Sequence, residues 1–134
     1  MRVSGALGLT GAGMLMCTLL TGCGTGGEAQ FADVAAARAA GGGPASWVPD
    51  WVPDGAADIR VRWDLDSNDS ILRFRHTGAW QPPTACTATT APGGAALTAS
   101  WWPAQLPDGT DYTCAQQPMA LRIAGDAVYA WSTR

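Results

Sequence analysis

Residues 58–76 contain two stretches in which apolar and polar side chains alternate strictly. The apolar positions are Ile59, Val61 and Trp63 in the first stretch and Leu72 and Phe74 in the second. A period of two residues is typical of antiparallel strands that bury one face. The segment Asp-Ser-Asn-Asp between the two stretches favours a turn. The sequence therefore predicts a β-hairpin whose apolar side chains share one face.

The alternation leaves two registers open for this hairpin, since both keep the apolar sets on one face. A two-residue loop would place Arg62 opposite Arg73. A four-residue loop, residues 67–70, would instead place Asp64 opposite Arg73. Like charges that lie directly opposite each other destabilise a sheet, so we predict the four-residue loop.

A second hairpin is predicted over residues 119–133, where Gly125 and Asp126 would form a two-residue turn between short strands. The predicted cross-strand pairs are Ile123 with Val128, Leu121 with Ala130, and Arg122 with Tyr129. The last pair would allow a cation–π contact on the face that also carries Trp131.

The segment between the hairpins is rich in turn-forming residues. Residues 78–94 contain three prolines and predict a loop. Residues 95–102, Ala-Ala-Leu-Thr-Ala-Ser-Trp-Trp, predict a strand, and residues 106–112 predict a turn that leads into a strand ending at Cys114. Together these elements predict a mainly β domain over residues 47–134, built as an antiparallel meander of about five strands.

Residues 24–46 differ in composition from this domain. Glycines bracket an Ala-rich middle with high helix propensity, but an isolated helix of this length is marginal. We therefore expect residues 23–46 to form a flexible, partly helical tether. As a flexible coil, 23 residues would span roughly 25–30 Å. A short helical turn is expected at residues 53–58, near the start of the folded domain.

The N-terminus has the pattern of an export signal. Residues 6–20 are apolar but interrupted by glycine, and they are too few for a comfortable membrane span. They end in Leu20-Thr21-Gly22-Cys23, which resembles the lipobox of bacterial lipoproteins. The resemblance implies that residues 1–22 are a signal peptide cleaved before Cys23. It also implies a diacylglycerol on the Cys23 sulfur, which would hold the protein at the extracytoplasmic face of the cell membrane.

The cysteines are consistent with an exported protein. Cys17 would leave with the signal peptide and Cys23 would be lipidated, so Cys86 and Cys114 remain in an oxidising compartment. We predict a disulfide between them, which would stabilise the fold by roughly 3–4 kcal/mol if chain entropy dominates. A zinc site is the alternative, but one histidine and two distant cysteines do not supply its ligands.

Charge and motifs give no sign of a nucleic-acid partner or of a cofactor. The 134-residue chain has a net charge of −3, and its eight basic residues are all arginines. A nucleic-acid-binding face would be strongly basic, so no nucleic-acid partner is expected. The sequence contains no phosphate-binding loop and no dinucleotide fingerprint, so no cofactor is expected.

Four arginines form the first candidate binding surface. Arg60, Arg62, Arg73 and Arg75 share the face of the first hairpin that lies opposite its apolar set. Clustered guanidinium groups bind phosphate or carboxylate polymers such as those of a cell envelope. The alternative is a solvated face whose charge is neutralised by nearby aspartates.

Tryptophans form the second candidate surface. Residues 47–54 repeat the unit Trp-Val-Pro-Asp, and the prolines favour an extended or turning entry into the domain. We predict that Trp51 packs on the domain, whereas Trp47 has the freer ring. Trp102 is the other candidate. Exposed rings would stack on sugars or on an apolar partner, whereas buried rings would fill a small core.

Two further constellations favour structural roles. Residues 64–69 have oxygen side chains at alternate positions, as at the start of a calcium loop. An EF-hand needs Gly at position six and Glu at position twelve, where this chain has Asp69 and Arg75, so a polar turn is favoured. His76 is the only histidine, and no nucleophile motif accompanies it.

Part of the mature sequence resembles small secreted or lipid-anchored proteins of actinobacteria. The shared features are Trp51-Val52-Pro53, Trp101-Trp102-Pro103 and the pair Cys86 and Cys114. Such proteins are mostly uncharacterised, so the resemblance implies no catalytic residues.

These observations predict a membrane-anchored lipoprotein with a noncatalytic binding or interaction module, whose partner is a cell-wall polymer or an envelope protein. One alternative is a small hydrolase that uses aspartates or His76. Another is an accessory protein of an envelope complex, in which the tryptophans only fill the core.

Replacement of the predicted lipidation site tests the anchor. A Cys23→Ser protein should lose its membrane association, because it cannot accept the diacylglycerol. Processing of the native protein should also be sensitive to globomycin. Cell fractionation followed by immunoblotting measures both effects. A Cys23→Ser protein that is still processed and membrane-bound would contradict the lipobox.

Overall fold

A computed structural model of the chain describes residues 25–115 and 118–133. The predicted signal peptide and Cys23 lie outside the described residues. The elements in chain order are β1 (Gly26–Asp33), α1 (Val34–Ala40), α2 (Gly42–Ala45), β2 (Ala57–Asp64), β3 (Asp69–Arg75), β4 (Cys86–Thr89), β5 (Thr110–Cys114), β6 (Met119–Ala124) and β7 (Ala127–Ser132). No helix within these described ranges is both long and apolar enough to cross a membrane.

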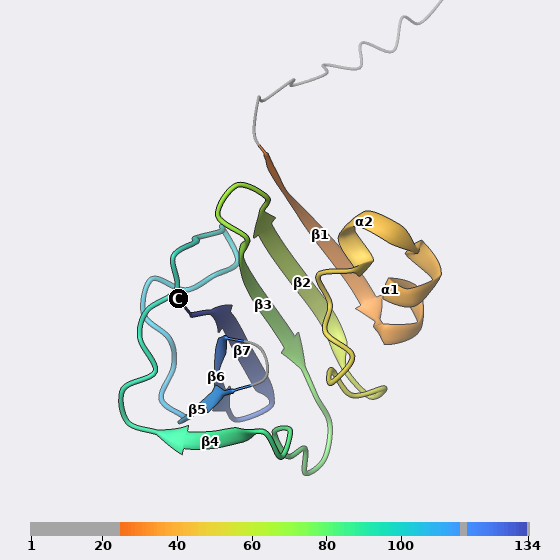
Figure 1. Cartoon of the computed structure of the whole chain (residues 1–134). Coiled ribbons are helices and arrows are strands. Elements are labelled where there is room, and N and C mark those ends of the chain that lie inside the picture. Colours follow the sequence, from red (N-terminus) through yellow and green to blue (C-terminus); the bar gives the residue numbers. More distant parts are fainter. Residues whose placement is uncertain (1–24, 116–117, 134) are drawn as a thin grey trace, which may run out of the picture.

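All the strands join one antiparallel sheet in the order β1-β2-β3-β7-β6-β5-β4 (Figure 1). The predicted mainly β, antiparallel fold is confirmed. The sheet has seven strands, however, where the sequence predicted about five. Two strands were not predicted, β1 in the expected tether and β4 in the expected loop around Cys86, whereas the strand predicted at residues 95–102 does not form.

The second hairpin forms as predicted. Gly125 and Asp126 make the turn, and the observed pairs are Ile123 with Val128, Leu121 with Ala130, and Arg122 with Tyr129. The guanidinium group of Arg122 does not depend on the tyrosine ring for a partner, because it hydrogen-bonds to both carboxylate oxygens of Asp111 on β5, at 2.6 and 2.7 Å.

The first hairpin has the predicted faces but a different register. Ile59 and Val61 are buried on the same face as Leu72 and Phe74, which confirms the alternation. The four-residue loop consists of residues 65–68 rather than 67–70. The predicted register is therefore wrong.

The loop position follows from local turn chemistry. The Asp64 carboxylate accepts hydrogen bonds from the backbone N–H groups of Asp66 and Ser67, at 2.8 and 3.2 Å. Asn68 adopts a φ of 58°, which asparagine tolerates better than most residues. Asp64 and Asn68 close the turn directly after Asp64. Each residue of β2 therefore pairs with a β3 residue four positions earlier than predicted, which leaves Arg60 opposite Arg73.

The expected flexible tether is wrong for residues 25–46. β1 pairs with β2 over its whole length, from Gly26 opposite Asp64 to Asp33 opposite Ala57. Asp33 then caps α1 by accepting a hydrogen bond from the N–H of Ala36 at 2.7 Å. Along β1 the exposure alternates residue by residue, as expected for an edge strand with one buried face.

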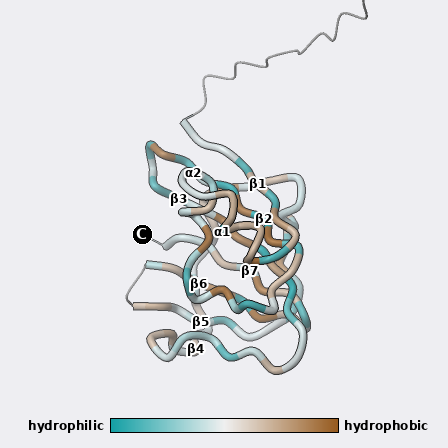
Figure 2. Tube along the Cα trace, turned by 90° about the vertical axis from the view of Figure 1, so that its right-hand side faces the viewer, coloured by the Kyte–Doolittle hydropathy of each residue, from teal (hydrophilic) through white to brown (hydrophobic). Residues whose placement is uncertain are grey.

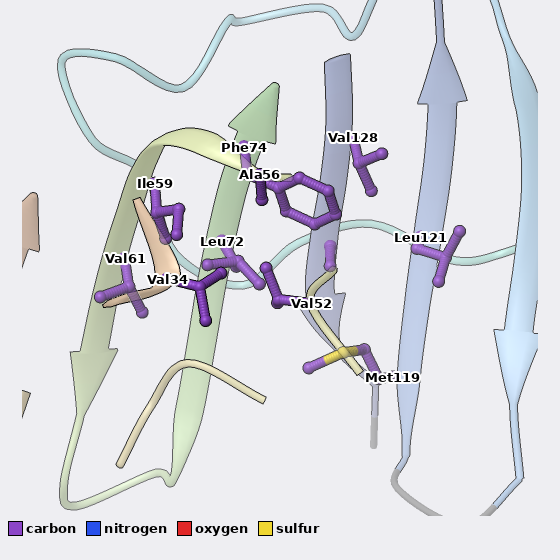
Figure 3. Close-up of a cluster of buried hydrophobic side chains, with 11 residues drawn as sticks. Val34, Val52, Ala56, Ile59, Val61, Leu72, Phe74, Met119, Leu121 and Val128 are labelled. Atoms are coloured by element: carbon purple, nitrogen blue, oxygen red, sulfur yellow. The ribbon is translucent and has the colours of Figure 1, made fainter. Parts of the chain in front are cut away.

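One face of the sheet is covered by α1 and by the segment that follows α2. Val34 of α1 and Val52 lie over the side chains of β2 and β3 (Figure 3). Figure 2 shows most of the hydrophobic stretches of the chain in the central part of the molecule. We call this buried cluster the first core. Where a helical turn was expected at residues 53–58, residues 53–56 form a single turn closed by a hydrogen bond from the N–H of Ala56 to the oxygen of Pro53, and Ala57 and Asp58 already belong to β2.

Both tryptophans of the repeated unit pack on the first core. Trp51 lies 6.1 Å from the ring of Phe74 and 6.0 Å from that of Trp80, which confirms its predicted packing. The ring of Trp47 stacks on Trp63 at 6.1 Å and 10°. The expectation of a freer ring at Trp47 is therefore wrong, because Trp63 on β2 supplies a stacking partner.

The opposite face of the sheet is also covered. Ile71, Ala120, Tyr129 and Trp131 are buried there under residues 90–109, which we call the covering loop. The loop contains residues 95–102, where a strand was predicted, and no strand forms there. Glycine and proline residues on both sides of this segment oppose a ladder, and its tryptophans pack onto the sheet instead. We call this buried cluster the second core.

The predicted disulfide between Cys86 and Cys114 is confirmed. The two residues lie directly opposite each other on β4 and β5. β4 is a four-residue edge strand, so the covalent link fixes the end of the sheet that has the fewest cross-strand pairs.

Substitution of Gly27 tests whether β1 belongs to the fold. A Cβ atom at Gly27 would overlap the ring of Trp63, which is held in place by Trp47. Gly27→Ala should therefore lower the free energy of unfolding by about 1–3 kcal/mol, as overpacking does in other cores. Chemical denaturation measures the change.

Gly55→Ala is the matched control, because its Cβ would meet no atom closer than 4.0 Å. Its stability should equal that of the native protein or exceed it slightly, since alanine restricts the unfolded chain. Equal stability of Gly27→Ala and Gly55→Ala would contradict the place of β1 in the fold and favour a flexible tether.

Candidate functional site

A row of polar side chains crosses the whole sheet on the face of the second core. Successive strand pairings align one residue from each of the seven strands: Gln30, Arg60, Arg73, Tyr129, Arg122, Asp111 and Thr89. Two of these neighbours, Arg60 and Arg73, carry the same charge. Like charges that lie directly opposite each other destabilise a sheet, so the structure has to compensate the repulsion.

Asp58 provides the compensation. A bulge in β2 gives this residue a φ of 48° and brings its carboxylate between the two arginines. Asp58 Oδ1 accepts hydrogen bonds from Arg60 Nε at 3.1 Å and from Gln30 Nε2 at 3.0 Å. Asp58 Oδ2 accepts one from Arg73 at 2.8 Å. Burial acts to raise the pKa of Asp58, but the two guanidinium groups outweigh it and hold the pKa below its usual value.

The predicted arginine surface is therefore not a free cationic face. Besides Arg60 and Arg73, Arg75 hydrogen-bonds to Asp126 through two nitrogens, and the pKa of Asp126 is lowered chiefly by this contact. Every arginine in the described residues lies within 4.0 Å of a carboxylate oxygen. The four candidate arginines lie on one face as predicted, but acidic residues neutralise most of their charge.

Arg62 is the exception within this group. Its nearest carboxylate oxygen, Glu28 Oε2, lies 3.7 Å away, which is beyond hydrogen-bonding distance. Its side chain is 46% exposed. Arg62 is thus the member of the four whose guanidinium group makes no hydrogen bond to a carboxylate within the described residues.

Arg62 lines a polar cavity of about 360 Å³ at one end of the sheet. The cavity is lined by Thr25, Gly26, Gly27, Glu28, Arg62, Trp63, Asp64, Asp66 and Leu97. Glu28 also fixes the covering loop, because its Oε1 accepts a hydrogen bond from Trp101 Nε1 at 2.6 Å. Glu28, which was expected to lie in the tether, therefore links β1 to the covering loop and lies beside Arg62.

A second cavity, of about 470 Å³, lies between the covering loop and the sheet. Its lining is mostly apolar and includes Gly93, Gly94, Leu97, Trp102, Ala104 and Trp131. The Trp102 ring is half-buried and stands nearly perpendicular to its neighbours Trp101, Tyr129 and Trp131, at centroid distances of 6.0, 5.5 and 6.3 Å. We call this cavity the aromatic groove. Leu97 lines both the groove and the polar cavity.

The remaining candidates lie away from these cavities. Trp47 stacks on the other face of the sheet. The Nδ1 of His76 lies 3.2 Å from the Gly78 carbonyl oxygen, and its Nε2 is buried without a hydrogen-bond partner in the part of the chain that the structure describes. Among the described residues neither ring nitrogen of His76 hydrogen-bonds to a carboxylate, so this geometry gives no support to the hydrolase alternative.

The acidic hairpin loop has the geometry of a polar turn. Asp64 bonds to the turn backbone, and Asp66 accepts a hydrogen bond from the Thr25 hydroxyl at 2.7 Å. Within residues 25–115 and 118–133, no group of three or more histidine, cysteine or acidic side chains is placed to hold a metal ion.

Comparison with known proteins gives one match. A family model described as the YbbD head domain matches residues 27–75, which span β1, both helices, β2 and β3. No curated protein and no solved structure matches the chain. The matched range begins within β1, in line with the observation that this segment belongs to the fold.

Glu28 and Leu97 are site residues that sequence analysis missed. Glu28 lies in the stretch Gly-Glu-Ala-Gln-Phe, whose alternation was a usable signal that the surrounding Ala and Gly obscured. Leu97 had no local signal, because its place depends on how the covering loop folds onto the sheet.

Neutralising Asp58 tests the electrostatic arrangement. Asparagine tolerates the positive φ at this position, so Asp58→Asn removes the charge and leaves the bulge intact. The free energy of unfolding at pH 7 should fall by about 1–2 kcal/mol, the range for a charged hydrogen-bond partner in a partly exposed site. Asp126→Asn, at an exposed pair, should change it much less.

The pH dependence gives the sign of the effect. Because the folded state lowers the pKa of Asp58, its stabilisation is complete above the ordinary aspartate value of about 3.9 and is lost as the pH falls through the folded-state pKa. The gap between Asp58→Asn and the native protein should therefore close in acid. A gap that is constant over this range would show that charge is not its origin.

Proposed function

We propose that this protein is a lipid-anchored, extracytoplasmic lipoprotein whose domain is a noncatalytic binding module for saccharide groups of the cell envelope. The observation that carries the proposal is the pair of cavities that share Leu97, one lined by tryptophans and the other by ionised side chains. The lipobox at residues 20–23 supports the location at the cell membrane.

The chemistry of the two cavities favours a sugar. A sugar ring has an apolar face that stacks on an aromatic side chain, as the half-buried Trp102 could provide in the aromatic groove. Its hydroxyl groups hydrogen-bond to carboxylates and guanidinium groups, which Glu28 and Arg62 provide in the polar cavity. Cavities of this size are typical of small-molecule sites.

The charge balance of the polar cavity favours neutral or amino sugars over anionic polymers. Three carboxylates, from Glu28, Asp64 and Asp66, line it beside one arginine. A phosphate or carboxylate group entering this cavity would meet a net negative surface. The structure therefore supports a different ligand chemistry from the anionic polymers for which the arginine cluster was first considered.

Binding can be tested with soluble glycan fragments released from cell walls by enzymatic digestion. The mature protein in detergent should bind them saturably, with a change in tryptophan emission and a heat signal in calorimetry. Arg62→Gln should weaken binding about tenfold, the loss expected for a hydrogen bond to a charged group. Ala104→Arg should weaken it at least as much, because the exposed Ala104 lines the aromatic groove.

Ala36→Arg is the matched control for charge and size, because Ala36 is exposed on α1, which lies on the other face of the sheet. It should bind as the native protein does. Equal binding by all four proteins would remove the cavities from the proposal. Lack of binding by the native protein, together with recovery of an envelope protein in a pull-down that Ala104→Arg abolishes, would assign the groove to a protein partner instead.

A further inference from the structure

The start of β1 and the turn between β2 and β3 lie at the same end of the molecule in two perpendicular views (Figures 1 and 2). Hydrogen bonds hold them together. The N–H of Leu65 donates to the Thr25 carbonyl oxygen at 2.9 Å, and the Thr25 hydroxyl donates to Asp66 at 2.7 Å. We call residues 65–68 the hairpin tip.

The hairpin tip lies very close in sequence to the predicted anchor. Only Gly24 separates Cys23 from Thr25. Two residue steps reach at most about 7 Å even when fully extended. The expected tether of residues 23–46 would have placed the domain far from the bilayer, but residues 26–40 and 42–45 are strand and helix. A lipid on Cys23 would therefore hold this end of the sheet at the membrane surface.

Leu65 gives the hairpin tip an exposed apolar side chain. Its side chain is 62% exposed, and no other large hydrophobic side chain in the described residues is exposed. A single exposed leucine is ordinary on a protein surface, so exposure alone would carry no conclusion. Here the exposed leucine is bonded through its backbone to the residue where the anchored segment enters the fold.

We propose that the hairpin tip is the membrane-facing end of the domain and that Leu65 contacts the extracytoplasmic leaflet of the bilayer. The proposal rests on the lipid anchor of the proposed function. The strands of the first hairpin then lead away from the membrane, and residues such as Thr77, which follows β3, lie at the far end. Seven strand residues in β3 correspond to a separation of about 23 Å.

The hairpin tip also indicates which lipid surface it fits. Asp64 and Asp66 flank Leu65, and their carboxylates are used in the turn and in the contact with Thr25. An anionic surface would repel these groups, whereas zwitterionic headgroups would not. Phosphatidylcholine vesicles are therefore the appropriate probe surface.

A depth measurement tests the proposal. The lipidated protein carrying Ser67→Cys is labelled with a fluorophore under nonreducing conditions, where the bridged Cys86 and Cys114 do not react. It is reconstituted into phosphatidylcholine vesicles that contain nitroxide-labelled lipid. Thr77→Cys with the same fluorophore is the matched control, since both positions are exposed. Fluorescence at residue 67 should fall by at least half, and fluorescence at residue 77 should hardly change.

The outcomes separate the docking proposal from the anchor. Adding Leu65→Ser to the Ser67→Cys protein should reduce the quenching while the protein still floats with the vesicles. Equal quenching at residues 67 and 77 in vesicle-bound protein, or no effect of Leu65→Ser, would overturn the docking proposal and leave the anchor intact. A native protein that does not float with the vesicles would overturn the anchor and the docking proposal together.

Discussion

Strands β3 and β7 lie next to each other in the centre of the sheet, and each buries side chains on both of its faces. Leu72 and Val128 point into the first core, whereas Ile71 and Trp131 point into the second. A sheet that is apolar on both sides needs cover on both sides. On one side α1 and residues 47–54 provide it. On the other side the cover is a long loop without regular structure. The candidate site exists because this loop, and not a helix, closes the second face.

The covering loop is held by aromatic packing and by few polar contacts. Trp102 stands at the centre of three nearly perpendicular ring contacts, and Trp101 bonds to Glu28 on β1. A loop fixed in this way leaves gaps between its backbone and the sheet, because glycine and alanine residues fill little volume. The aromatic groove is such a gap. Its tryptophans therefore serve the fold and line the groove, which makes Ala104 and Arg62 the better positions for separating binding from stability.

The parts of the structure that local chemistry determines could be predicted from the sequence. The turn at Gly125 and Asp126 fixed the second hairpin, and cysteine counting identified the bridge between Cys86 and Cys114. The first register could not be predicted, because a like-charge pair was judged by itself. Asp58 offsets the repulsion between Arg60 and Arg73 through a bulge that no local sequence pattern predicts.

β1 and the candidate site were missed because they depend on contacts between distant segments and not on local chemistry. Ala-rich and Gly-rich composition suggested a tether for residues 24–46, although Gly27 is required by close contact with Trp63. Residues 95–102 resembled a strand in isolation, but they form a loop that packs against Tyr129 and Trp131. The polar cavity joins β1, β2 and this loop, so its existence depends on three segments whose neighbours sequence analysis had not placed.

The position of the cavity links the proposed function to the proposed orientation. Thr25 and Asp66 belong both to the polar cavity and to the contact between β1 and the hairpin tip. If this end of the domain lies on the membrane, then the cavity lies near the bilayer rather than at the outer end of the molecule. A ligand must then reach the membrane surface, which chain ends, soluble fragments and lipid-linked saccharides can do. The interior of a cross-linked wall cannot. A short anchor would thus restrict the accessible saccharides by geometry, in addition to the restriction that the carboxylates would impose by charge.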